Sequence, residues 1–106
     1  MGASLGNIPL ELEKARRARA AGNEGRARVC ARRAAGWAAR EYLTGRGIPA
    51  GNDAFEALQS LMSRPDLPPD LRRAAEELTR RVDQDFSLPD GMDLIAAAVN
   101  MIAGLK

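Results

Sequence analysis

Apolar residues recur at intervals of three and four along most of the chain, and clusters of glycine and proline interrupt the pattern. This spacing lines up apolar side chains on one side of a helix, so it predicts amphipathic helices between the interruptions. The predicted helices cover about residues 8–21, 24–43, 54–63, 69–82 and 92–103. No β-branched run alternates with polar residues, so strands are not expected. Short links between four or five helices predict an all-α, up-and-down bundle.

Residues at the predicted boundaries have the chemistry of helix ends. Asn23 can cap the second helix, and Asp53 followed by Glu56 resembles a capping box at the start of the third. Pro69 suits the first turn of the fourth helix, whereas Gly22 ends the first. The boundary residues and the apolar periodicity therefore agree.

The last predicted helix differs from the others because apolar residues nearly encircle it. A helix of this kind needs burial on more than one side. Two interpretations stay open: the helix is central to the core, or one of its faces packs on a second copy of the chain. The second interpretation predicts a homodimer whose interface contains Leu94, Ile95, Ala98, Met101 and Ile102.

Composition restricts the function classes. The chain has 106 residues, which predicts one domain over residues 1–106. It has no histidine and one cysteine, which excludes histidine-dependent nucleophilic catalysis and cysteine or histidine zinc sites. We therefore expect no enzyme activity and no cofactor. The most apolar stretch, residues 94–105, is shorter than the roughly 20 residues that span a bilayer, and no signal peptide is evident, so we expect a cytoplasmic protein without membrane contact.

Positive charge is concentrated in one part of the sequence. Residues 14–46 contain ten basic and two acidic residues, a net charge of +8, whereas the whole chain carries +2. Arg26, Arg33 and Arg40 recur every seven residues and therefore share one side of the second helix. Arginine matches phosphate geometry, and Trp37 could stack on a base, so this side is a candidate nucleotide or RNA site. The alternatives are a solvated or ion-paired face, with Trp37 as a core anchor.

Two segments carry a resemblance to a known family. The run from Ala21 through the Arg-rich stretch to Arg40 is similar to the first two helices of HEPN-like domains, and the runs 82–86 and 93–98 are similar to the close of that family. The resemblance implies an up-and-down helical bundle, often dimeric. It also implies kinship with toxin ribonucleases and with partners of small nucleotidyltransferases. The ribonucleases carry an arginine followed a few residues later by a histidine, and no histidine follows Arg80 or Arg81 here.

Together these observations predict a non-catalytic, HEPN-like, dimeric protein-interaction module. The resemblance suggests a nucleotidyltransferase or a toxin–antitoxin-type system as the source of the protein partner. The alternative is a nucleotide- or RNA-binding module that uses Arg26, Arg33, Arg40 and Trp37. No metal ligand set is expected, because the acidic residues near the last loop lack the spacing of a calcium-binding loop.

Overall fold

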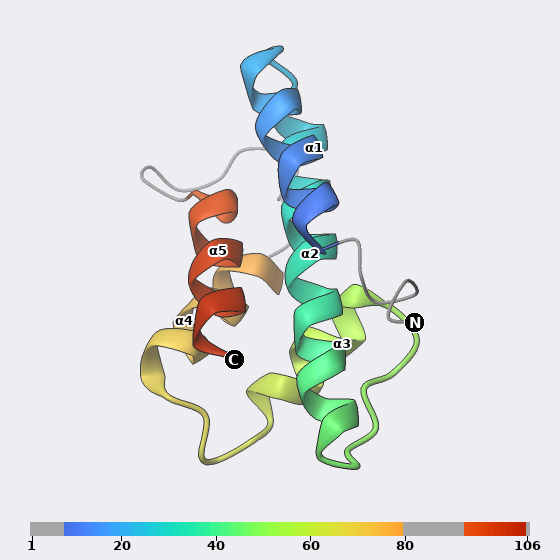
Figure 1. Ribbon diagram of the computed structural model, residues 1–106. Coiled ribbons are helices and arrows are strands. Elements are labelled where there is room, and N and C mark those ends of the chain that lie inside the picture. Colours follow the sequence, from blue (N-terminus) through green and yellow to red (C-terminus); the bar gives the residue numbers. More distant parts are fainter. Residues whose placement is uncertain (1–7, 80–92, 106) are drawn as a thin grey trace.

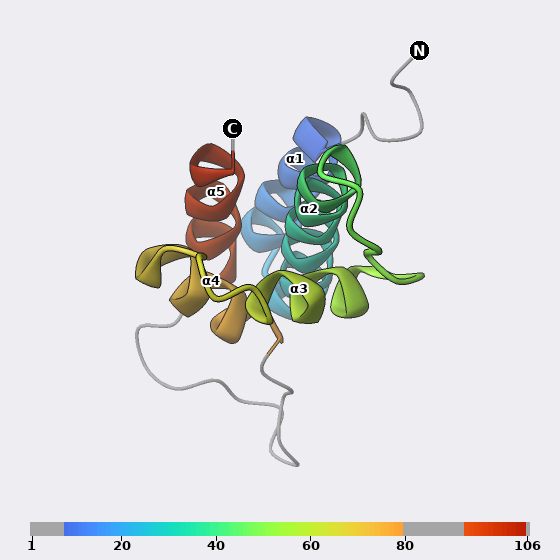
Figure 2. The ribbon, with the colours of Figure 1, turned by 90° about the horizontal axis from the view of Figure 1, so that it is seen from below.

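The computed structural model describes residues 8–79 and 93–105, and within them the chain forms helices and no strands. The helices are α1 (Ile8–Ala20), α2 (Glu24–Gly45), α3 (Ala54–Met62), α4 (Pro69–Thr79) and α5 (Leu94–Gly104). Figure 1 shows α1 and α2 as an antiparallel pair, with α5 beside them running in the same direction as α2. In Figure 2, α3 and α4 lie in a row across one side of these three helices. The prediction of an all-α helical bundle is confirmed.

Side chains at the helix starts explain most of the boundaries. The Oδ1 atom of Asn23 accepts a hydrogen bond from the backbone N–H of Arg26 at 3.1 Å, as expected of a cap. The Oδ1 atom of Asp53 accepts one from the N–H of Glu56 at 2.8 Å. The Glu56 carboxylate reaches back one residue further than in a standard capping box, because it accepts the N–H of Asn52 at 2.6 Å.

The last helix begins two residues later than the sequence pattern predicts. Its cap is Asp93, whose carboxylate accepts the backbone N–H groups of Ile95 and Ala96 at 3.0 and 3.2 Å. The same carboxylate accepts a hydrogen bond from Nη1 of Arg19, and Nη2 of Arg19 donates to Glu24 at 2.7 Å. Arg19 therefore ties the end of α1 to the starts of α2 and α5.

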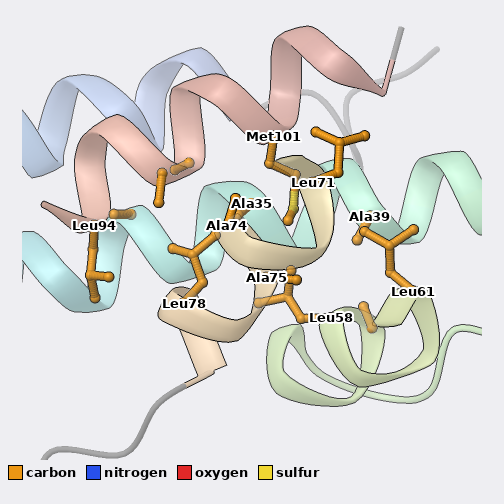
Figure 3. Packing of buried hydrophobic residues seen from close by; sticks show 14 of the residues in the cluster. Ala35, Ala39, Leu58, Leu61, Leu71, Ala74, Ala75, Leu78, Leu94 and Met101 are labelled. Carbon is orange, nitrogen blue, oxygen red and sulfur yellow. The ribbon is translucent and has the colours of Figure 1, made fainter. Parts of the chain in front are cut away.

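The core is built from alanine and leucine rather than aromatic residues. The helix α2 packs against α1, α3 and α5, and its small buried residues allow those helices to approach closely. Figure 3 shows the apolar side of α4 (Leu71, Ala74, Ala75 and Leu78) pointing between α2, α3 and α5. The spacing of these side chains by three and four residues is the periodicity that predicts the fourth helix.

Four of the five residues predicted at a dimer interface lie inside the single chain. Leu94, Ile95, Ala98 and Met101 are at most 7% exposed, because α2 and α4 cover them. They cannot reach a second copy while the bundle is intact, which corrects the prediction that they form an outer face. The apolar surround of α5 is explained by a position between two neighbouring helices of its own chain. Ile102 alone among the five is half-buried.

Candidate interaction surface

One side of α2 remains open to solvent although the helix is otherwise the centre of the bundle. Nine of its residues are buried against other helices. The open side carries the residues that we call the α2 stripe: Arg26, Val29, Arg33, Trp37 and Arg40. Their spacing of three, four, four and three residues keeps them on one line along the helix. The structure thus brings together all four residues predicted for a nucleotide or RNA site, and adds Val29.

The side chains of the α2 stripe differ in exposure. The three arginines are exposed, and Val29 is 46% exposed, which makes it one of two exposed large hydrophobic residues in the described part of the chain. Trp37 is half-buried, so it is neither a core anchor nor a free surface residue. The stripe therefore has apolar surface between cations.

Two of the three arginines in the stripe form no ion pair with the residues that the structure describes. Over residues 8–79 and 93–105, neither Arg26 nor Arg40 has its side chain in an ion pair. Arg33 has a weak one, because its Nη1 atom lies 3.5 Å from Oε1 of Glu11. Most of the positive charge of the stripe is therefore uncompensated within the described residues.

Glu11 is a buried carboxylate at the contact between α1 and α2. Its side chain is 5% exposed, and Oε2 lies 3.6 Å from Nζ of Lys14. The Oε1 atom has the ion pair with Arg33 but no hydrogen bond. Sequence reasoning missed this residue, although its position four residues before the buried Ala15 would have placed it on the inner side of α1.

A hollow of about 410 Å³ lies beside the α2 stripe. Its walls are Val29, Arg32, Arg33 and Trp37 of α2, with Asn52, Asp53, Ala54 and Phe55 around the start of α3. Gly36 sets how close these two helices come, because a Cβ atom on Gly36 would lie 2.3 Å from Cβ of Ala54. No other residue type would allow this approach unchanged, so the hollow depends on Gly36.

Arg32, on the wall of the hollow, has a structural role. Its Nε donates a hydrogen bond to the carbonyl oxygen of Leu78 on α4. Burial lowers the pKa of Arg32, and the nearby Arg28 guanidinium lowers it further. Arg32 thus joins α2 to α4, and only part of its charge faces the hollow.

A second hollow lies where the ends of α1, α2 and α5 meet. It has a volume of about 430 Å³, and its apolar lining includes Ile8, Pro9, Tyr42, Ile102 and Leu105. The guanidinium of Arg46 lies 3.8 Å from the centre of the Tyr42 ring, a cation–π contact at the rim. We call this the end hollow. It contains the one residue of the predicted dimer face that stays at the surface, Ile102.

Other kinds of site have little support in the structure. In the part of the chain that is described, no three cysteine, aspartate or glutamate side chains lie together as a metal site requires. Of the acidic residues near the last loop, Asp83, Asp85 and Asp90 lie outside the described residues, and Asp93 caps α5. None of the helices in residues 8–79 and 93–105 combines the length and the hydropathy needed to cross a bilayer.

Comparison with known proteins gives no independent guide: no protein family, curated protein or solved structure matches this chain.

Proposed function

We propose that this chain is a non-catalytic, HEPN-like cytoplasmic helical bundle that acts as a protein-interaction module, with the α2 stripe as its binding surface. One observation carries the proposal: the most central helix keeps one side at least partly open to solvent, and that side combines Trp37 and Val29 with regularly spaced arginines. Tryptophan and arginine are the residue types most enriched at the energetic centres of protein interfaces. The absence of histidine supports the non-catalytic part.

Affinity purification from native cells, with nuclease treatment, tests this proposal. The bait is compared with two variants of equal charge change. One is Arg26→Glu/Arg40→Glu in the stripe, and the other is Arg16→Glu/Arg73→Glu on α1 and α4. All four arginines are exposed and have no ion pair within the described residues. We expect a partner protein that co-purifies with the wild type and with the control variant after nuclease treatment, but not with the stripe variant. Equal recovery with both variants contradicts the proposal.

A second candidate function is binding of a nucleotide or RNA by the same stripe. Arg26 and Arg40 favour it, because neither is neutralised within residues 8–79 and 93–105. Trp37 is the only tryptophan in the chain, so its fluorescence reports directly on the stripe. Titration with ATP and with poly(U) at low salt tests this function. A change in fluorescence that disappears as salt rises supports it, since phosphate contacts are salt-sensitive. No change with either ligand contradicts it.

Self-association is a separate part of the proposal. The HEPN-like resemblance implies dimers, and the end hollow is the apolar surface that a second copy could cover. Sedimentation velocity over a range of concentrations tests this, with Ile102→Glu as the disrupting variant. A monomer at all concentrations contradicts the dimer. The resemblance further suggests a nucleotidyltransferase or a toxin–antitoxin-type protein as the partner of the module.

A further inference from the structure

From the chemistry of the α2 stripe we infer that its partner is an acidic amphipathic helix, which lies along α2 with carboxylates at seven-residue spacing and an apolar side chain in the hollow beside Trp37. This inference rests on the proposed function and specifies the partner. It follows from three features of the stripe: the spacing of its charges, the position of its apolar surface, and the acidic residues at its edges.

The spacing of the arginines fits a helix. Arg26, Arg33 and Arg40 are seven residues apart, which is about 10.5 Å along the axis. A second helix packed alongside α2 presents every seventh residue to the same line, as in coiled coils. Carboxylates at that spacing would meet Arg26 and Arg40, which lie two such intervals apart and form no ion pair within the described residues.

The apolar part of the stripe fits a side chain of the partner. Val29 and Trp37 stand between the arginines, and both line the 410 Å³ hollow together with Phe55. An anchor from one helix inserted into a hollow of the other is a common mode of helix recognition. The partner helix therefore carries an apolar residue between its acidic positions.

Acidic residues at the edges of the stripe argue against the other occupants. The carboxylate of Asp53 lines the hollow, and Glu11 is already paired with Arg33, so a phosphate entering there would meet negative charge. A second copy of this chain is also disfavoured. A two-fold contact between two stripes would place arginines against arginines, and like charges repel. An acidic helix keeps its carboxylates at exposed Arg26 and Arg40 and avoids both problems.

Fluorescence anisotropy with synthetic peptides tests the inference. The probe is a fluorescently labelled peptide of 22 residues, the length of α2. It carries glutamate at every seventh position and a leucine between successive glutamates. The comparison peptides replace glutamate by lysine or scramble the order, and poly(U) is the nucleic acid probe. We expect saturable binding of the acidic peptide, weakened about tenfold by Arg26→Glu/Arg40→Glu and by Trp37→Ala. The Arg16→Glu/Arg73→Glu variant should bind like the wild type.

The outcomes separate this inference from the proposed function. Equal binding of acidic and scrambled peptides, or no binding of the acidic peptide, overturns the inference. If stripe-dependent capture of a cellular protein still succeeds in that case, the interaction module stands and only the partner chemistry is wrong. Binding of poly(U) that the stripe variant abolishes, without binding of the acidic peptide, overturns the inference in favour of nucleic acid.

Discussion

Replacing Gly36 by alanine tests whether the contact between α2 and α3 builds the hollow. The new Cβ atom would lie 2.3 Å from Cβ and 2.5 Å from Cα of Ala54. Carbon atoms in contact are normally about 3.5–4.0 Å apart, so the start of α3 would have to move by about 1 Å or more. A flexible side chain cannot absorb this clash, because one of the opposed atoms belongs to the backbone.

Two opposing effects set the size of the change in stability. Overpacking costs about 1–3 kcal/mol, and a clash with backbone belongs in the upper half of that range. Alanine is better than glycine inside a helix by about 1 kcal/mol. We therefore expect Gly36→Ala to lower the free energy of unfolding by about 1–2 kcal/mol. For a domain of this size the loss corresponds to a fall in Tm of roughly 5–15 °C.

Urea unfolding followed by circular dichroism measures this loss. The matched control is Gly45→Ala, at the C-terminal end of the same helix, where a new Cβ atom meets nothing within 4 Å. The control should be as stable as the wild type or more stable. If Gly36→Ala is as stable as Gly45→Ala, α2 and α3 do not depend on glycine for their contact. That result would contradict the claim that Gly36 shapes the hollow beside the α2 stripe.

Three further substitutions test other parts of the structure. Leu94→Ala should cost about 2–5 kcal/mol at every protein concentration, because Leu94 is 1% exposed within one chain; a loss seen only in dilute samples would instead place it between subunits. Glu11→Leu should leave the free energy of urea unfolding unchanged or raise it, since the buried carboxylate has an oxygen without a hydrogen bond; a large loss would refute this view. Arg19→Ala should lower the free energy of unfolding near neutral pH by at most about 1 kcal/mol, because its ion pairs with Glu24 and Asp93 are partly exposed, and this difference should vanish in acid. An unchanged dependence of the free energy of unfolding on pH would contradict a stabilising role for these ion pairs.

The direction of the pH effect at Arg19 follows from its two carboxylate partners. The hydrogen bond from Arg19 lowers the pKa of Glu24. Burial raises the pKa of Asp93, but the hydrogen bonds from Ala96 and Arg19 outweigh it and the net shift is downward. Carboxylates with a lowered pKa stabilise the fold above their unfolded pKa of about 4, and this stabilisation is lost as the pH falls through the folded value. The free energy of unfolding, measured between about pH 6 and 2, should therefore differ most between the wild type and Arg19→Ala above about pH 4.

Local signals predicted the helices well because helix ends depend on neighbouring residues. Asn23 and Asp53 cap their helices through bonds to residues three positions on, so the sequence contains the whole motif. The cap at Asp93 was missed because the apolar pattern begins at Met92, and nothing in periodicity marks which residue carries the cap. The seven-residue spacing of the arginines similarly predicted a shared side of α2, since that spacing is local.

Features that depend on distant segments could not be predicted. The sequence of an apolar helix such as α5 is the same whether its own chain or a second copy covers it, and only the positions of α2 and α4 decide between the two. The hollow beside the α2 stripe depends on Gly36 meeting Ala54, which a glycine inside a helical pattern does not reveal. The 46% exposure of Val29 likewise depends on which sides of α2 the other helices cover.

Mapping of backbone amide shifts by NMR tests the central claim most directly. The isotope-labelled chain is titrated with the acidic helical peptide, and the shift of each assigned amide is followed. We predict saturable shifts concentrated between Arg26 and Arg40 and around Phe55, with little change at Ile102 or along α4. Shifts centred on the end hollow, or no shifts in α2, would contradict the claim that the α2 stripe is the binding surface.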